Sequence, residues 1–456
     1  MFVLGLTSGC GEVEGTAERS VLLFTVDTLR ADQLGAYGGP ASTPHFDALA
    51  AQSLVFERAY SQATITHPAL SSLHTGLLPH QHGVQTQTGL LREGSTTLAQ
   101  RMRDSGRRTA AFTANLCKLQ GHPGTVFHDG FDDLGCGMLD DPEDYRDQWE
   151  WDKRVVDLGL EWLASNPGPF FVWLHLMDPH AEHRPPPHLI DPAWPPLRDR
   201  MEQYAFYNGI EERRERPDPQ EYEHLWALYR AEIEGADEQL GRVLNQIERR
   251  RDADDIAVIF SSDHGEELFE TWSRYDHGLS LTEGVLRVPL TVRAPGVAPG
   301  RFEAPVELLQ ITPTALHIVG AAVPANVAGP SLLSERPSRG YALSSAARLT
   351  ITLRSAEHRY WQRLSPTPPK RPPEAAPWRL DAPWYQQREA LASYGADGVQ
   401  PTWLPLHDPD NRATGSHHEL RWNQIEAAFP PRGITREILA DAELSNQLQR
   451  LGYVGD

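Results

Sequence analysis

The chain has 456 residues, of which 40% are hydrophobic, and it carries a formal net charge of −20 at pH 7. This length and hydrophobic content exclude wholesale disorder and suit one large catalytic domain with a smaller companion. Because nucleic acid and anionic lipid would repel a surface of this sign, neither is expected as the main partner.

The N-terminal residues MFVLGLTSGCGEVEG resemble the end of a bacterial lipoprotein signal. A short apolar run and small residues precede Cys10, and an acidic, polar tail follows it. We expect residues 1–18 to be a signal remnant and linker, and the protein to be exported and lipid-anchored in the bacterial envelope. The alternative is a frayed apolar terminus. A lipid on Cys10 is the only membrane contact that the sequence predicts, because no apolar run reaches the roughly 18 residues of a membrane-spanning helix.

Residues 19–325 alternate short β-rich runs with helical patterns, which predicts an α/β domain with a doubly wound, mostly parallel sheet flanked by helices. The predicted strands cover residues 21–26, 108–114, 169–178, 255–265 and 287–296. The predicted helices cover residues 43–53, 96–106 and 147–165, and residues 220–251 are expected to form one helix or two. Thr43 and Pro44 are expected to serve as N-cap and first residue of the first helix. In an exported protein, Cys117 and Cys136 could form a disulfide.

Three of the predicted strands end in acidic residues, and one of these acids is followed by histidine, at Asp27, Asp178 and Asp263-His264. Ligand sites of doubly wound sheets lie beyond the carboxyl ends of the strands, so we expect these side chains to converge. Two carboxylates and an imidazole suit a divalent cation. The alternative is that Asp27 caps a helix and Asp263 begins a turn. We favour a metal site.

The composition changes beyond about residue 325, and we expect residues 326–456 to form a smaller α+β domain. Residues 348–364 alternate like a hairpin, and the Pro-rich segment 365–377 is expected to be a surface loop. The last residues, 434–456, predict a helix that ends near Gly452.

Several blocks between about residues 20 and 320 resemble the sulfatase family, in the family's order. They are VDTLRADQLGAYG, TPHFDALAAQSLVFERAYSQA, PALSSLHTGLLPHQHGV, FFVWLHLMDPH, VIFSSDHGEEL and HGLSLTEGVLRVPLTVRAPG. The resemblance implies an alkaline phosphatase-like fold and the hydrolysis or transfer of sulfuryl or phosphoryl groups at a metal site. It also implies one divalent ion, Ca²⁺ first by family with Mn²⁺ or Zn²⁺ as alternatives, and a small-molecule or glycan ester as substrate.

The resemblance assigns roles to individual residues. The implied set has Asp27, Asp263 and His264 as metal ligands, Thr66 as nucleophile or metal-side ligand, His180 near the transferred group and His277 at the leaving oxygen. Thr28 stands where many sulfatases have a second aspartate. Three further histidines are expected in loops or in supporting positions, namely His80, His82 and His183.

The sequence departs from sulfatases proper at the nucleophile. The pattern C/S-x-P-x-R falls on residues 66–70, so that Thr66 replaces the Cys or Ser that becomes formylglycine and Leu70 replaces the arginine. Threonine cannot undergo that conversion, which excludes formylglycine chemistry. The Lys and His of the second family signature fall on Ala114 and Leu116, and Lys118 could substitute only if its loop shifts.

A threonine nucleophile is nevertheless chemically reasonable, because a metal ion can activate its hydroxyl. The sequence therefore predicts a sulfatase-like, metal-dependent hydrolase of sulfuric or phosphoric esters. One metal is expected, although Asp178, His180 and His277 could hold a second. The alternatives are a phosphodiesterase or phosphoryl transferase of the same superfamily, or a degenerate, non-catalytic binding protein with this fold. The oligomeric state stays open.

Overall fold

The structure is a computed structural model in which the N-terminal two thirds of the chain are described almost throughout. The described residues are 18–114, 117–120, 122–138, 147–212, 217–270, 275–278, 280–338, 341–346, 350–355, 358–363, 389–394, 401–404 and 436–437. The predicted lipid site at Cys10 and the predicted loop 365–377 therefore lie outside the described residues. Among the helices that are described, none is both long and apolar enough to cross a membrane.

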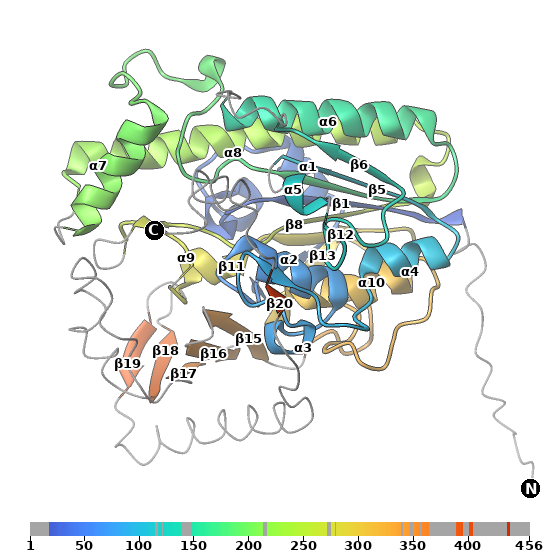
Figure 1. Cartoon of the computed structure of the whole chain (residues 1–456). Helices are drawn as coiled ribbons and strands as arrows, with labels where there is room; N and C mark the ends of the chain where they lie inside the picture. The colour runs from blue at the N-terminus through green and yellow to red at the C-terminus, as the bar shows by residue number, and fades with distance from the viewer. Residues whose placement is uncertain are drawn as a thin grey trace, which may run out of the picture.

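An eight-stranded sheet forms the centre of the molecule, in the order β13-β2-β12-β8-β1-β7-β5-β6 (Figure 1). Its strands are β1 (Ser20–Val26), β2 (Leu54–Phe56), β5 (Arg108–Thr113), β6 (Asp133–Cys136), β7 (Phe170–Leu176), β8 (Ile256–Ser262), β12 (Leu290–Arg293) and β13 (Gly300–Phe302). The five strands from β8 to β6 are parallel, and β12 is antiparallel to both of its neighbours. The predicted mostly parallel sheet is confirmed.

Helices cover both faces of this sheet (Figure 1). One face carries α1 (Pro44–Ala51), α6 (Gln148–Ser165) and α8 (Pro219–Glu248), and the other carries α2 (Thr66–Thr75), α4 (Leu98–Asp104) and α10 (Ile311–Ile318). Alternate side chains of β1 serve the two faces, because successive residues of a strand point to opposite sides. Leu22 and Phe24 pack in the first helical layer, whereas Val21 and Leu23 pack in the second.

The predicted elements of this domain are confirmed, with small shifts of their ends. Residues 287–296 form two strands, β11 (Arg287–Val288) and β12, with Pro289 between them. Thr43 is the N-cap residue of α1, but its side chain makes no capping hydrogen bond. Instead Asp237 of α8 accepts hydrogen bonds from the backbone N–H groups of His45 and Phe46, at 3.1 and 2.7 Å.

Short elements complete the domain. The strands are β3 (Ala59–Tyr60), β4 (Gly89–Leu90), β9 (Glu267–Leu268), β10 (Tyr275–Asp276) and β14 (Val306–Glu307), and the helices are α3 (Pro79–His82), α5 (Cys117–Gln120), α7 (Arg200–Glu212) and α9 (Glu283–Leu286). Single 3₁₀ turns are η2 (Ala31–Gln33), η3 (Gly35–Tyr37), η4 (Pro187–Leu189), η5 (Ala253–Asp255) and η6 (Leu308–Gln310). Cys136 is disulfide-bonded, and the side chain of Cys117 lies outside the described residues.

The C-terminal segment contributes a five-stranded antiparallel sheet, β15 to β19 in sequential order. Its strands are β15 (Tyr341–Ala346), β16 (Thr350–Ser355), β17 (His358–Arg363), β18 (Glu389–Tyr394) and β19 (Pro401–Leu404). The pair β16–β17 confirms the predicted hairpin. The predicted C-terminal helix is wrong at β20 (Arg436–Glu437), which pairs with β4, and its other residues lie outside those described. The boundary of a separate domain at residue 326 stays a prediction.

Candidate functional site

Three neighbouring strands in the centre of the sheet end at one point. The parallel register places Val26 of β1 beside Leu176 of β7 and Ser262 of β8, so the residues that follow these strands emerge together. The backbone N–H of Asp27 still donates to the carbonyl of Leu176, at 2.9 Å, which fixes the start of the loop. Buried apolar strands thus deliver polar side chains to a common edge, where α/β sheets place their ligands.

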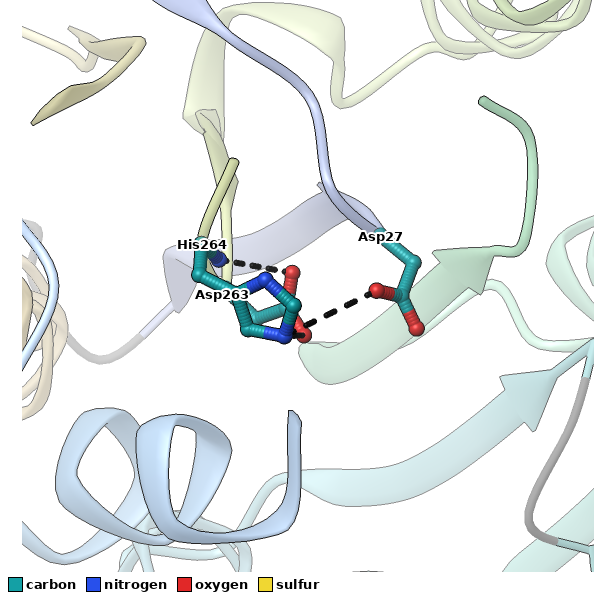
Figure 2. Close-up of side chains that lie close together, drawn as sticks. All are labelled: Asp27, Asp263 and His264. Carbon is teal, nitrogen blue, oxygen red and sulfur yellow. Dashed lines mark hydrogen bonds and ion pairs between the residues drawn. The ribbon is translucent and has the colours of Figure 1, made fainter. Parts of the chain in front are cut away.

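Asp27, Asp263 and His264 form a fully buried donor group at this edge, with one ligand atom of each within 4.8 Å of the others (Figure 2). The Nε2 atom of His264 lies 3.3 Å from Asp263 Oδ2 and 4.0 Å from Asp27 Oδ1. Thr66, the first residue of α2, points its hydroxyl into the same group. Its Oγ1 atom lies 3.4 Å from both Asp27 Oδ2 and His264 Nε2.

The hydrogen bonds of Asp263 indicate which of its oxygens faces the donor group. Oδ1 accepts from the backbone N–H groups of Thr28 and His264, at 3.2 and 2.7 Å. Among the described residues, Oδ2 accepts no hydrogen bond, and it lies 3.3 Å from His264 Nε2. Burial and then the neighbouring carboxylate of Asp27 raise the pKa of Asp263. Two buried carboxylates beside an imidazole are therefore held close together at an electrostatic cost, and this donor set fits a divalent cation.

Asp27 is the anionic member of this carboxylate pair. Burial alone would raise its pKa, but the contact with His175 and the charges that His180 and His264 can carry hold the pKa of Asp27 well below its ordinary value. Asp27 therefore offers an ionised carboxylate within a fully buried group.

Thr28 adopts a backbone conformation that β-branched residues rarely take, with φ at 52°. Asp263 accepts a hydrogen bond from its N–H, and the Tyr229 hydroxyl donates to its carbonyl at 2.7 Å. Its own Oγ1 atom is buried and has no hydrogen-bond partner within the described part of the chain. The side chain of Thr28 therefore places a hydroxyl beside Asp263, and this position adds no second carboxylate to the donor group.

His277 lies beside the donor group, its ring centroid 4.5 Å from that of His264. Its Nδ1 atom is 2.9 Å from Asp276 Oδ1 and 3.2 Å from both carboxylate oxygens of Glu266. Burial lowers the pKa of His277, but Glu266 and then Asp276 outweigh it and raise that pKa well above its ordinary value. His277 therefore provides a cationic imidazole next to the proposed ligands.

His180 completes the cluster, its ring centroid 5.1 Å from that of His277. It follows β7 in a loop that α6 holds in place, because Asp152 accepts from the N–H groups of Met177 and Asp178 at 2.6 and 3.0 Å. The described residues do not bring together the possible second metal-binding set, Asp178, His180 and His277. They group His277 with Glu266 and Asp276 instead.

Two positions where the family has a cationic residue are occupied here by apolar residues, and both side chains are buried. Leu70 is fully buried in the cluster beneath α2 and offers no donor. Ala114 is also buried, and its N–H donates to the carbonyl of His175 at 2.9 Å. Leu116 and the side chain of Lys118 lie outside the described residues.

Two of the three weaker histidine candidates are engaged within the fold away from the donor group. His82 contacts Ser72 Oγ at 3.0 Å, and the buried His183 pairs with Glu232 at 2.7 Å. His80 is half-buried in α3.

Sequence reasoning missed His175, Glu266 and Asp276. The imidazole of His175 is fully buried in β7, with Nε2 3.7 Å from Asp27 Oδ2. Its signal was a single polar residue in the apolar strand FFVWLHL. Glu266 meets His277 because β9 pairs antiparallel with β10, which places Asp276 opposite Glu267. Asp276 is the residue that precedes His277 in the sequence.

The chain is similar to known sulfatases over nearly all of the residues predicted as the catalytic domain. A family model described as Sulfatase matches residues 19–321. The uncharacterized sulfatase YidJ of Escherichia coli K12 is 25% identical over 369 residues, which cover 70% of this chain and 71% of the relative. Arylsulfatase K of Xenopus laevis is 24% identical over 65% of this chain and 62% of its own length.

Solved structures show the same fold. The phosphonate monoester hydrolase SpPMH from Silicibacter pomeroyi superposes with a TM-score of 0.69 and 20% sequence identity, over 91% of this chain and 96% of that structure. At this identity the likeness concerns the fold. The alkaline phosphatase-like architecture expected from the sequence is therefore confirmed.

Proposed function

Because the chain belongs to the sulfatase family, we propose that it is a metal-dependent hydrolase of sulfuric or phosphoric esters that uses Thr66 in place of formylglycine. One observation carries the proposal. The Thr66 hydroxyl stands at the N-terminus of α2 with Oγ1 3.4 Å from both Asp27 and His264, inside a buried group of metal-type donors. A helix N-terminus also favours the negative charge of an alkoxide or of a sulfuryl or phosphoryl group.

The proposed ion is one divalent cation held by Asp27, Asp263, His264 and Thr66 Oγ1. When bound, it would supply the positive charge that lowers the pKa of the Thr66 hydroxyl and neutralises charge on the transferred group. Family membership favours Ca²⁺, whereas the imidazole of His264 favours Mn²⁺ or Zn²⁺, because Ca²⁺ prefers oxygen ligands alone.

The side chains divide the reaction into two displacements. Thr66 Oγ1 forms a bond to sulfur or phosphorus while the bond from that atom to the ester oxygen breaks, and the hydroxyl proton is released to water. His277 donates a proton to the departing oxygen, so a neutral alcohol leaves. Since Nδ1 of His277 faces Glu266 and Asp276, Nε2 is the nitrogen that donates. Water then attacks the same sulfur or phosphorus atom while the bond from that atom to Thr66 Oγ1 breaks. His277 takes a proton from the attacking water, and Thr66 Oγ1 takes a proton from solvent, which regenerates the hydroxyl.

A phosphodiesterase or phosphoryl transferase is the second candidate. The pairing of aspartate with histidine at 263–264 and the threonine nucleophile favour phosphorus chemistry, and a hydrolase of phosphonate monoesters shares the fold. The buried Leu70 supports the remaining alternative, a binding protein without turnover, since no arginine neutralises the transferred group there. For either enzyme we propose a small-molecule or glycan ester as substrate, and export with a lipid on Cys10.

The test pairs one leaving group with several transferred groups: 4-nitrophenyl sulfate, 4-nitrophenyl phosphate and bis(4-nitrophenyl) phosphate, each with Ca²⁺, Mn²⁺ or Zn²⁺. Thr66→Ala is expected to lower kcat/KM by roughly 10³-fold or more on the preferred probe. Thr75→Ala is the matched control, because Thr75 ends the same helix and its hydroxyl contacts the backbone of Ser71 and Leu77. Turnover that survives Thr66→Ala, or a metal-loaded protein without turnover, would contradict the proposal.

A further inference from the structure

His175 lies at a position where burying an imidazole is energetically unfavourable. It belongs to β7, which lies between β1 and β5 and whose seven residues are all buried. Burying a polar ring costs free energy unless its nitrogens find partners. The position beside Asp27 suggests that this cost is offset at the donor group.

One ring nitrogen of His175 is fixed by the neighbouring strand. Thr25 and His175 are register partners in β1 and β7, and Thr25 Oγ1 lies 2.9 Å from His175 Nδ1. The same hydroxyl oxygen accepts a hydrogen bond from Trp173 Nε1 at 2.8 Å. Its single proton can go to His175 Nδ1 at 2.9 Å or to the carbonyl of Leu174 at 3.4 Å. We assign this proton to His175 Nδ1, the nearer of the two acceptors.

This assignment leaves the ring proton of His175 on Nε2, which faces Asp27 Oδ2 at 3.7 Å. That distance is longer than a hydrogen bond and corresponds to an electrostatic contact. A carboxylate has only acceptors, so an N–H is the form of His175 that attracts it. The two oxygens of Asp27 are then distinguished: Oδ2 faces His175, and Oδ1 faces His264 at 4.0 Å.

We propose that His175 is a positioning residue for the metal site, which orients Asp27 through a chain that runs from Trp173 through Thr25 and His175 to the Asp27 carboxylate. His175 is not a ligand in this arrangement, because the compact donor group among the described residues consists of Asp27, Asp263 and His264. The inference rests on the proposed metal function of that group. Partners of this kind, behind a metal ligand, typically change metal affinity 10- to 100-fold.

Three substitutions at position 175 distinguish a role in orienting Asp27 from a role in core packing. In His175→Gln the amide N–H₂ can replace Nε2 as donor to Asp27, whereas His175→Asn can replace only the group near Nδ1, and His175→Leu removes both. We expect metal affinity in the order wild type, Gln, then Asn and Leu, with Leu weaker than wild type by about 10- to 100-fold. A purely structural role would not favour Gln over Asn in this order.

Two further variants test the chain itself. Thr25→Val keeps the shape of the side chain and removes the hydroxyl, so it is expected to weaken metal binding less than His175→Leu and to add nothing in the His175→Leu background. His74→Phe is the matched control. His74 is equally buried and packs on the same Trp173, with ring centroids 4.2 Å apart. Its substitution should leave metal affinity within about twofold of wild type.

The measurement is isothermal titration of the full chain, freed of metal with EDTA, with Mn²⁺ and Zn²⁺, and circular dichroism to confirm that each variant is folded. A wild type that binds metal while His175→Leu and Thr25→Val bind it equally well would overturn the inference alone. A wild type that binds neither these ions nor Ca²⁺ would overturn the proposed metal function and the inference with it.

Discussion

Asp263→Asn should change the stability of this protein in opposite directions with and without metal. The carboxylates of Asp27 and Asp263 approach within 4.8 Å in a fully buried group. At this separation and an effective dielectric constant of about 20, two negative charges repel by roughly 3 kcal/mol. Asparagine keeps the Oδ1 acceptor for the Thr28 and His264 amides and removes the charge. We expect the metal-free variant to be about 1–2 kcal/mol more stable than wild type, which is less than the full repulsion because burial and Asp27 raise the pKa of Asp263 and so relieve part of its charge.

Metal should reverse this order. At a concentration 100 times its Kd, a cation stabilises the wild type by about 2.7 kcal/mol. If the loss of the Asp263 carboxylate weakens binding about 100-fold, the same concentration stabilises the variant by only about 0.4 kcal/mol. Urea unfolding in EDTA and in saturating Mn²⁺ or Zn²⁺ measures both values. Asp157→Asn is the control. Asp157 is a partly exposed carboxylate on α6 that pairs with Lys153 and Arg242, so its loss should cost at most about 1 kcal/mol, by the same amount with and without metal.

Two results would refute this reasoning. A metal-free Asp263→Asn variant that is less stable than wild type would show that the buried carboxylate carries no electrostatic cost. An equal gain from metal in the two proteins would show that the ion binds elsewhere.

Three further predictions concern the surrounding fold. Burial lowers the pKa of His74 to about 3, so acid protonates His74 in the unfolded state before it does so in the folded state. The wild type should therefore lose stability below pH 6.5. In urea titrations, the stability of His74→Phe relative to wild type should rise by about 2 kcal/mol as the pH falls from 7 to 5. No change with pH would contradict this. Asp237→Ala should cost about 1–2 kcal/mol, because Asp237 caps α1; an unchanged urea midpoint would show that the cap is dispensable. Leu70→Arg restores the family's arginine in sequence, yet it should destabilise the fold by about 3 kcal/mol or more and raise no turnover, since the side chain enters an apolar cluster.

The central sheet and the donor group were predictable for a common reason. Short, largely apolar runs such as residues 21–26 and 256–260 favour buried strands over helices, and the acids that follow them are then expected at the sheet edge. The amino-acid sequence was therefore enough to group Asp27, Asp263 and His264. The single long helix α8 was similarly marked by its amphipathic period.

Contacts set by register could not be predicted in this way. In the sequence alone, His175 is indistinguishable from a core residue, and only the alignment of β1 with β7 shows that it lies beside Asp27. Glu266 meets His277 only through the pairing of β9 with β10. The cap of α1 comes from Asp237, 191 residues away from Phe46. The C-terminal prediction failed at Arg436 for the same reason, because pairing with β4 outweighs a local helical pattern.

Thr66 is the proposed nucleophile of a metal-dependent ester hydrolase. The most direct measurement stops the reaction with 4-nitrophenyl sulfate or phosphate by acid and weighs the protein by mass spectrometry. We expect a sulfuryl or phosphoryl adduct on the peptide that contains Thr66. It should form with metal and be absent in EDTA and in Thr66→Ala. Metal-dependent turnover in which Thr66→Ala is as active as wild type, or an adduct on another residue, would contradict it.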